Sequence, residues 1–220
     1  MSKFGELQAV IWDMDGVLVD SCSFHFSAWH RIFDKYKWIV SDETLRGTFG
    51  MTNDQVIQNF CNSPLDHETI NAIGSEKDRL FREFISTEAR FLPGVQTWLQ
   101  EFRKNGIKQA LASSGSWENI NTVLDTLHAR QYLDAIVSGE DSASKPAPDV
   151  FLLAAKELAA SPSRCLVIED AIAGVQAAKV AGMQCLAVTT TNPPEQLNGA
   201  DLIVRDLIDL KKQMIKKLFL

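Results

Sequence analysis

Two aspartates near the start of the chain, Asp13 and Asp15, directly follow an apolar run. Side chains two positions apart in an extended backbone project to the same side, so both carboxylates could reach one bound substrate. One carboxylate could attack phosphorus while the other protonates the leaving oxygen and then takes a proton from water. The spacing therefore indicates covalent phosphoryl transfer. The alternative is a plain turn, because aspartate favours turns and Gly16 follows.

Further polar residues stand where other apolar runs end. They are Ser113 and Ser114 after "QALA", Lys145 in "SKPAPD", and Glu169 and Asp170 after "CLVI". Ligands of open parallel sheets bind outside the carboxyl ends of the strands, so these side chains are expected to converge with the two aspartates. The alternatives are ordinary loop positions for the serines, a solvated charge for Lys145, and acids at a helix start for Glu169 and Asp170.

Several carboxylates beside one lysine suit a hard, oxygen-liganded ion such as Mg²⁺, which also takes a phosphate oxygen. A carboxylate that approaches a phosphate dianion is repelled, and two unit charges near a protein surface interact by about 4 kcal/mol at about 4 Å. A Mg²⁺ ion held by Asp13 and Asp170, with Lys145 on the other side, would offset this repulsion. Mg²⁺ is therefore the predicted cofactor.

The apolar runs that lead to these residues are predicted to form a sheet. They show little alternation, which is typical of strands buried on both faces of a parallel sheet. The runs are residues 7–13, 107–114, 134–139, 164–170, 184–190 and 200–206. Helical patterns alternate with them at residues 116–129, 147–160 and 170–182, the last with Gly182 as a left-handed stop. This order predicts an α/β fold, a doubly wound parallel sheet of Rossmann-like topology.

One long interruption separates the first strand from the second. Only helical patterns occur there, at residues 23–36, 52–61, 66–73 and 75–86. Thr52 and Gln55 have the spacing of a capping box. One apolar helix face is expected to hold Trp29, Ile32, Phe33 and Tyr36. We therefore predict two domains, a Rossmann-like catalytic core of residues 1–20 and 92–220 and an inserted α-helical cap domain of residues 21–91.

At these motifs the chain resembles the haloacid dehalogenase (HAD) superfamily. "DMDGV" matches the nucleophile loop DxDG[VT], "LASS" the strand-end serine, "SKPAPD" the lysine motif and "IEDA" the acidic metal motif, all in the family's order. The resemblance covers essentially the whole chain, and it narrows to the β-phosphoglucomutase-like and sugar-phosphate phosphatase subfamily. It implies a HAD core with an inserted helical cap.

The resemblance also implies roles for the core residues. Asp13 would be the phosphorylated nucleophile and Asp15 the general acid and base. Ser113 and Lys145 would grip the transferring phosphoryl group, and Ser114 is a further candidate for substrate binding.

For the metal ion, the resemblance implies ligands from Asp13, from the main-chain carbonyl of Asp15 and from Asp170. Glu169 would lie in or near the same ligand shell. These oxygens agree with the Mg²⁺ site that the acidic residues themselves indicate.

The helical insert contains four candidates for substrate binding: His25, Trp29, Asn53 and Lys77. The resemblance matches His25 to a histidine that couples cap closure to catalysis, Trp29 to a tryptophan of the sugar pocket and Lys77 to a lysine that reaches the substrate. The mutases have a Lys-Gly-x-Ser-Arg loop whose arginine binds a second phosphate. Here the loop is "FGMTN", with Phe49 and Asn53 at the two cationic positions. The alternatives are packing roles for His25 and Trp29 and a solvated face for Lys77.

Composition restricts the partners and the location. The chain has 220 residues, a net charge of −6 and no basic stripe, which argues against a nucleic-acid partner. No segment approaches roughly 20 apolar residues, and the start lacks the features of a secretory signal. We therefore expect a cytoplasmic monomer with no membrane partner, acting on a small phosphorylated metabolite. The four cysteines lie far apart without zinc-site spacing, which predicts reduced thiols.

Three functions follow from these residues. The first is a Mg²⁺-dependent phosphatase that hydrolyses a small phosphorylated metabolite, a sugar phosphate, through an aspartyl-phosphate. The second is a β-phosphoglucomutase-type mutase, which must hold a bisphosphate by both ends, a task suited to the arginine that "FGMTN" lacks. The third is a non-catalytic phosphate-binding protein of the same fold, which the complete set of acidic and lysine motifs argues against.

Overall fold

The computed structural model describes residues 3–48, 51–61, 63–140 and 142–220. The chain divides into two compact units, one of Met1–Asp20 with Arg90–Leu220 and the other of Ser21–Ala89. Two contacts mark the return of the chain to the first unit. Phe91 forms an antiparallel bridge with Val19, and the Leu92 amide donates to the Leu18 carbonyl at 2.9 Å.

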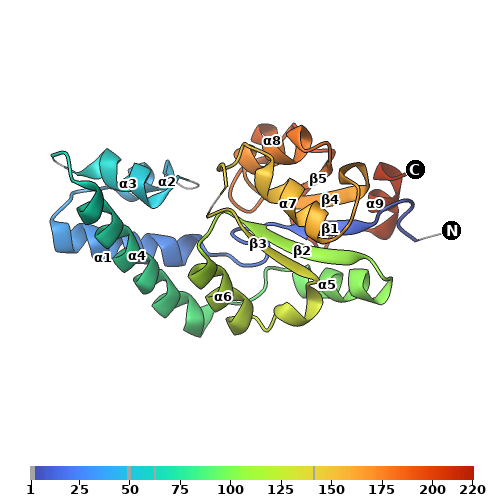
Figure 1. Ribbon diagram of the computed structural model, residues 1–220, viewed down its shortest axis with the longest axis horizontal. Coiled ribbons are helices and arrows are strands. Elements are labelled where there is room, and N and C mark those ends of the chain that lie inside the picture. Colours follow the sequence, from blue (N-terminus) through green and yellow to red (C-terminus); the bar gives the residue numbers. More distant parts are fainter. Residues whose placement is uncertain (1–2, 49–50, 62, 141) are drawn as a thin grey trace. The chain divides into compact units, whose positions relative to one another are not determined.

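The first unit is built on a six-stranded sheet in which every strand pair is parallel. The strand order is β3-β2-β1-β4-β5-β6 (Figure 1). The strands are β1 (Ala9–Trp12), β2 (Lys108–Ser113), β3 (Ala135–Ser138), β4 (Cys165–Glu169), β5 (Gln184–Val188) and β6 (Leu202–Val204). This arrangement confirms the predicted doubly wound parallel sheet, and its order reverses between β1 and β4.

Helices cover both faces of this sheet, which explains why its strands are apolar on both sides. The helices of the unit are α5 (Val95–Lys104), α6 (Trp117–Thr126), α7 (Asp149–Glu157), α8 (Ile172–Val180) and α9 (Lys212–Leu218). Short 3₁₀ turns are η1 (Arg130–Tyr132), η2 (Pro162–Arg164) and η3 (Pro194–Gln196). In Figure 1, α7 and α8 lie on one side of the sheet and α5 and α6 on the other.

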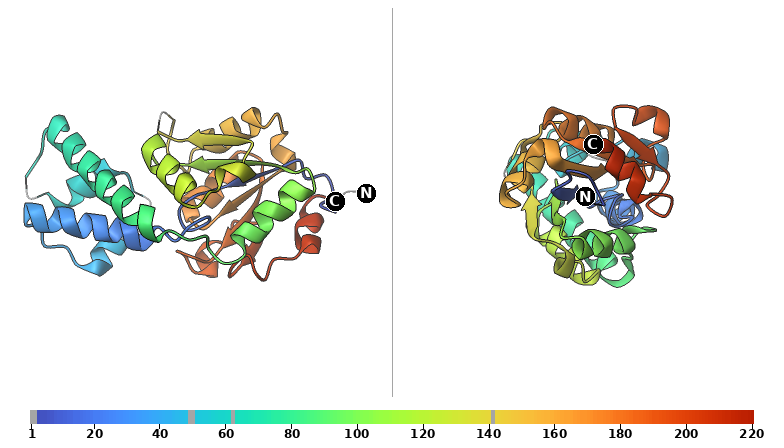
Figure 2. Two further views of the ribbon diagram at one scale, coloured as in Figure 1. Left: turned by 90° about the horizontal axis from the view of Figure 1, so that it is seen from below. Right: turned by 90° about the vertical axis from the view of Figure 1, so that its right-hand side faces the viewer.

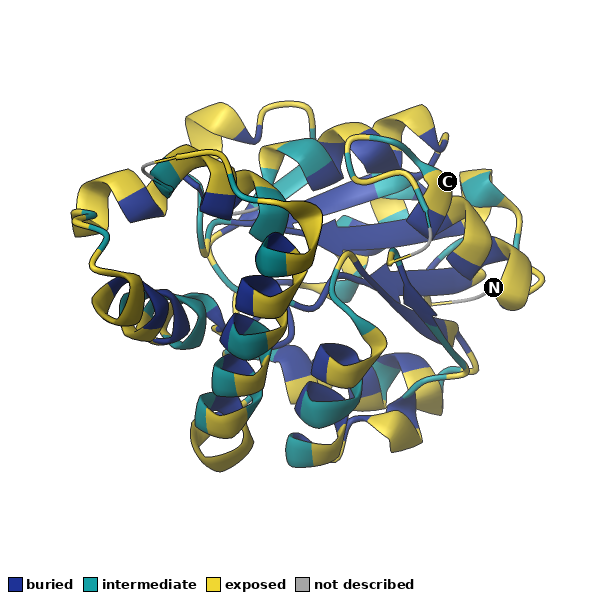
Figure 3. Cartoon of the chain, turned by 60° about the vertical axis from the view of Figure 1, so that its left-hand side comes forward, coloured by how far each residue is buried: buried dark blue, intermediate teal, exposed yellow. Residues whose placement is uncertain are grey.

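Alternate residues of the strands fill two separate layers. Ile11 and Val167 belong to a buried cluster with Phe151 of α7, whereas the Trp12 ring points to the other face and meets Phe102 of α5 at 6.1 Å. Figure 3 shows the central strands as almost continuously buried, whereas the first residues of the edge strands β3 and β6 are half-buried. The last helix closes the unit beside the start of the chain, where the Glu6 amide donates to the Phe219 carbonyl at 3.0 Å (Figure 2).

The second unit contains helices and no strand among its described residues. These helices are α1 (Cys22–Tyr36), α2 (Asp42–Arg46), α3 (Asn53–Phe60) and α4 (His67–Glu88). Their shared core consists of Trp29, Ile32, Phe33, Leu45, Val56, Ile57, Ile70 and Ile73. The predicted capping box is confirmed, because Thr52 accepts from the Gln55 amide and the Gln55 side chain accepts from the Thr52 amide.

Several sequence predictions differ from the structure. The patterns at 66–73 and 75–86 form the single helix α4, and Tyr36 is 36% exposed because it lies at the last turn of α1, outside the shared core. Helices α2, α5 and α9 are not among the predicted elements. In the described part of the chain, no helix combines the length and the hydropathy needed to cross a bilayer.

Candidate active site

The acidic candidates of the core meet where the strand order of the sheet reverses. Asp13 follows the last residue of β1, and its amide donates to the Ile168 carbonyl of β4 at 3.0 Å. Glu169 ends β4, and Asp170 follows it. One carboxylate oxygen from each of these three residues can be chosen so that all three lie within 4.8 Å of one another. The parallel pairing of β1 with β4 is therefore what brings residues 13 and 170 together.

Lys145 lies inside this acidic group. Its Nζ donates to Asp13 Oδ1 at 2.5 Å and to Glu169 Oε1 at 2.7 Å. The ammonium also lies 4.7 Å from the ring centroid of Phe151, and the side chain is only 9% exposed. Lys145 is thus a buried cation paired with two carboxylates, and the solvated alternative is wrong.

Glu169 is held on both of its oxygens. Oε1 accepts from Lys145, while Oε2 accepts from the amides of Asp170 and Ala171 at 2.7 Å each. The Cα of Gly174 in α8 packs directly against this carboxylate, since a Cβ built there would lie 1.7 Å from Oε1. A side chain at position 174 would therefore displace Glu169.

Asp170 is held from the loop that follows β5. Thr191 Oγ1 donates to Asp170 Oδ2 at 2.6 Å, and Asn192 Nδ2 donates to the Asp170 carbonyl at 3.0 Å. Gly16 has a left-handed φ of +76° and packs so closely that a Cβ there would lie 1.8 Å from Asp170 Oδ2. The glycine after "DMD" therefore meets two requirements, a turn and a close approach.

The remaining core candidates lie at the same edge of the sheet. Asp15 is half-buried and lies in a turn. A hydrogen bond from the Gly16 amide to the Val19 carbonyl, at 2.8 Å, closes this turn. Ser113 ends β2, is 1% exposed and accepts from the Gly115 amide through its Oγ at 3.1 Å. Ser114 follows it and is exposed.

Burial and mutual repulsion shift the proton affinities of this group. Burial raises the pKa of Asp13 to about 8. Lys145 acts against this shift, whereas Glu169 and Asp15 act in the same direction as burial. Burial also raises the pKa of Asp170, with Glu169 and Asp13 acting in the same direction. Burial alone would lower the pKa of Lys145, but Asp13 and Glu169 raise it above its ordinary value.

These residues fit a divalent cation. Three buried carboxylates face one ammonium, so the ionised group carries an excess of negative charge that a further cation would balance. Carboxylate oxygens are the ligands that Mg²⁺ prefers. The acidic cluster is therefore a candidate metal site.

The four candidates of the helical unit form one cluster within that unit. Lys77 Nζ lies 2.9 Å from His25 Nδ1 and donates to Asp78 Oδ1 at 3.1 Å. Asn53 Nδ2 donates to Asp78 Oδ2 at 3.0 Å. The Lys77 ammonium lies 5.5 Å from the Trp29 ring centroid, and the residue is 4% exposed, so its solvated alternative is wrong. Phe49, the other loop position of interest, lies outside the described residues.

Sequence reasoning did not identify four residues of these two clusters. They are Gly174, Thr191 and Asn192 in the core and Asp78 in the helical unit. The rule that strand ends carry ligand-contacting residues could have found Thr191 and Asn192, which follow the β5 run in "AVTTTN". Gly174 and Asp78 carry no such signal, because both lie within ordinary helical patterns.

Comparisons with known proteins agree with this geometry. A family model described as haloacid dehalogenase-like hydrolase matches residues 10–188. The β-phosphoglucomutase of Bacillus subtilis is 32% identical over 217 residues, which cover 95% of this chain and 94% of that protein. A phosphorylated carbohydrates phosphatase of Thermotoga maritima is 30% identical over 183 residues, covering 81% of this chain and 83% of that one.

A solved structure shows the same likeness. The β-phosphoglucomutase of Clostridium difficile superposes with a TM-score of 0.84 at 29% identity, and the match covers 97% of each chain. The similarity therefore extends over the sheet unit and the helical unit alike.

Proposed function

Because the chain belongs to the haloacid dehalogenase-like hydrolase family, we propose that it is a Mg²⁺-dependent phosphatase acting on a small phosphorylated metabolite, a sugar phosphate. Its relatives include a phosphatase and a phosphomutase, and the prediction of an enzyme is confirmed. The observation that carries the proposal is the buried group of Asp13, Lys145, Glu169 and Asp170 at the reversal of the sheet. It combines a nucleophile with the charges that phosphoryl transfer requires.

Asp13 is the proposed nucleophile. Its carboxylate attacks phosphorus and forms an aspartyl-phosphate while the bond to the leaving oxygen breaks, and Asp15 gives that oxygen its proton. Asp15 then takes a proton from a water molecule whose oxygen attacks the aspartyl-phosphate. This second step releases inorganic phosphate and restores Asp13.

Lys145 and Ser113 are proposed to bind the transferring phosphoryl group. Lys145 stands 2.5 Å from Asp13 Oδ1, and its raised pKa keeps it charged beside the nucleophile. Ser113 offers a hydroxyl at the end of β2, the strand adjacent to β1. Ser114, the exposed neighbour, is proposed to contact the substrate.

The proposed Mg²⁺ ligands are Asp13, the main-chain carbonyl of Asp15, and Asp170. Glu169 is proposed to lie near this shell, because both of its oxygens already accept hydrogen bonds from the protein. When bound, Mg²⁺ would supply positive charge that stabilises the transferring phosphoryl group.

The charge of the cluster in the helical unit favours a phosphatase over a phosphomutase. We propose that His25, Trp29, Asn53 and Lys77 select the substrate. The Lys77 ammonium is paired with the Asp78 carboxylate, to which Asn53 also donates. The pairing leaves little net positive charge to hold a second phosphate, which a mutase requires and a phosphatase does not.

A mutase of the β-phosphoglucomutase type remains the second candidate, because two of the similar proteins described above carry that name. Incubation with β-glucose 1-phosphate and a trace of the 1,6-bisphosphate separates the two functions. Release of inorganic phosphate supports the phosphatase, whereas accumulation of glucose 6-phosphate with little free phosphate supports the mutase.

The experiment that tests the phosphatase is a panel of sugar, polyol and nucleotide phosphates assayed for phosphate release. We expect release from at least one sugar phosphate with Mg²⁺, none in excess EDTA, and none from Asp13→Asn. Full activity of Asp13→Asn with Mg²⁺ present would show that the proposed mechanism is wrong.

A further inference from the structure

The two carboxylate oxygens of Asp170 have different surroundings. Oδ2 accepts from Thr191 Oγ1 at 2.6 Å and lies against the Cα of Gly16, where a Cβ would come within 1.8 Å. Both contacts are closest at the same oxygen, since that Cβ would lie 3.1 Å from Oδ1. They fix the rotation of the carboxylate and occupy one side of it.

The direction of the Thr191 hydroxyl proton follows from its neighbours. Asn192 Nδ2 lies 3.0 Å from Thr191 Oγ1 and 3.0 Å from the Asp170 carbonyl, so its two hydrogens can serve these two acceptors. Thr191 Oγ1 thereby accepts one hydrogen bond and has a single proton to give. Thr191 Oγ1 has two possible acceptors in Asp170. The contact with Oδ2, at 2.6 Å, is shorter than the contact with the Asp170 carbonyl, at 3.2 Å.

We propose that Thr191 is a positioning residue that makes Asp170 a one-oxygen metal ligand, by engaging Oδ2 and leaving Oδ1 for the ion. The inference rests on the proposed Mg²⁺-dependent function. Mg²⁺ demands near-octahedral geometry, whereas Ca²⁺ accepts carboxylates through one or both oxygens. Engagement of Oδ2 therefore favours Mg²⁺ over Ca²⁺ at this site.

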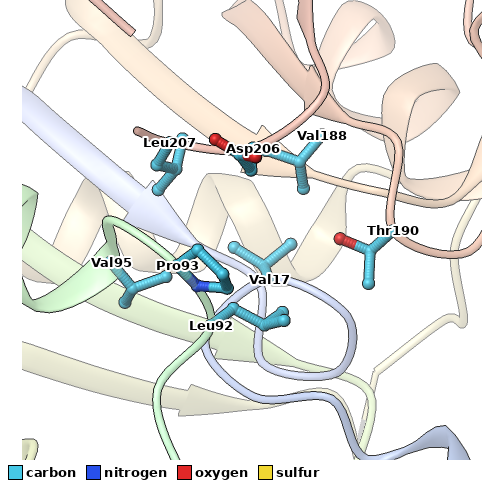
Figure 4. Close-up of a pocket in the computed structure, with 8 residues that line it drawn as sticks. All are labelled: Val17, Leu92, Pro93, Val95, Val188, Thr190, Asp206 and Leu207. Carbon is cyan, nitrogen blue, oxygen red and sulfur yellow. The ribbon is translucent and has the colours of Figure 1, made fainter. Parts of the chain in front are cut away.

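The test compares Thr191→Val, which removes the hydroxyl at nearly constant shape, with Thr191→Ser, which keeps it. Thr190→Val is the matched control from the same "TTT" stretch. The Thr190 side chain lines a different, small cavity of about 20 Å³ with residues such as Val17 and Val188 (Figure 4). Each metal-free 220-residue protein is titrated with Mg²⁺ and with Ca²⁺ in a calorimeter, and its thermal unfolding in EDTA verifies the fold.

For Thr191→Val we expect the dissociation constant for Mg²⁺ to rise by about tenfold or more, as for other residues that orient metal ligands. The constant for Ca²⁺ should rise less, so the preference for Mg²⁺ falls. Thr191→Ser and Thr190→Val should keep the wild-type preference. If Thr191 only supported the fold, Thr191→Val would lower the stability in EDTA without changing the ratio of the dissociation constants for Mg²⁺ and Ca²⁺.

An unchanged ratio in folded Thr191→Val, or a ratio in Thr191→Ser as altered as in Thr191→Val, would overturn the inference. If Thr191→Val does not fold, Asn192→Ala takes its place, with a smaller shift in the same direction expected and an unchanged ratio as the contrary result. Failure of the wild-type protein to bind Mg²⁺ or to release phosphate would instead refute the proposed function. The two failures are therefore distinguishable.

Discussion

At the scale of single residues, the site depends on two glycines that bring backbone against carboxylates. Gly16 packs on Asp170, and Gly174 packs on Glu169 from within α8. A glycine inside a helix costs about 1 kcal/mol relative to alanine, so Gly174 is unfavourable for the helix itself. Its place is explained by Glu169, which needs that space to reach Lys145.

Gly174→Ala is therefore expected to reduce activity despite the better helix propensity of alanine. The added Cβ would lie 1.7 Å from Glu169 Oε1 and would move the carboxylate away from Lys145. We expect phosphate release to fall by about a hundredfold, the size of effect expected when groups around the reacting atoms are misplaced by about 1 Å. The measurement is kcat on the best substrate of the panel.

Gly199→Ala is the matched control, because its Cβ would meet Val175 at an ordinary 3.4 Å. This variant should retain wild-type activity. Equal activities of Gly174→Ala and the wild type would contradict the role given to this close approach.

Sequence alone predicts the charged residues of the site but not the residues that hold them. Asp13, Glu169 and Asp170 stand at the ends of apolar runs and Lys145 lies in the loop after another such run, and one topological rule places all four together. The position of Gly174 depends on how tightly α8 packs on Glu169. The packing of α8 on Glu169 is a tertiary contact, which the spacing of residues along the chain does not predict.

At the scale of elements, local signals and tertiary packing can be told apart in the helical unit. The capping box of α3 depends on residues three apart, and the sequence predicts it correctly. The continuity of α4 does not follow from the sequence, because Gly74 and Ser75 resemble a break between two helices. Gly74 instead lies in close packing with α3, where a Cβ would meet the Cβ of Asn53 at 3.3 Å.

Thr52→Ala is expected to destabilise α3 by about 1 kcal/mol, because the Gln55 amide loses its side-chain acceptor. Hydrogen exchange of the α3 amides measures this local effect directly. Thr52→Ser retains the hydroxyl and should exchange nearly as slowly as the wild type. Equally slow exchange in Thr52→Ala would argue against a stabilising role of the capping box.

Helix α5 is not among the predicted helices, although its sequence contains a helical pattern. Its buried residues Val95, Trp98, Leu99 and Phe102 have the spacing of one helix face. The short helix α2 differs, since Leu45 is its one buried residue and leaves no periodicity to detect. The length of a helix, more than its composition, therefore decides whether the sequence predicts it.

At the scale of the whole molecule, the buried charges should make the stability of the metal-free protein depend on pH. Burial raises the pKa of Asp13 from its ordinary value of 3.8 to about 8 in the folded protein. The folded state therefore holds this proton more tightly than the unfolded chain. The resulting stabilisation is complete below pH 3.8 and is lost as the pH rises to about 8.

In EDTA we expect the unfolding temperature to fall as the pH is raised from about 5 to about 8. With Mg²⁺ in place of EDTA, the stabilisation should be largest at about pH 8, where the carboxylates are ionised and can bind the ion. Thermal unfolding across this range, with and without Mg²⁺, is the measurement. Asp13→Asn cannot titrate at this position and should show a shallower pH dependence. An identical slope in the variant and the wild type would show that Asp13 does not hold the proton.

Covalent catalysis by Asp13 can be tested by trapping the aspartyl-phosphate intermediate. The enzyme is quenched in acid during turnover of its best substrate with Mg²⁺, reduced with borohydride and digested, and the peptide that contains Asp13 is sequenced by mass spectrometry. We predict that Asp13 is converted to homoserine, the product of a reduced aspartyl-phosphate, only when substrate is present. An unmodified Asp13 during active turnover, or a modification at another residue instead, would contradict it.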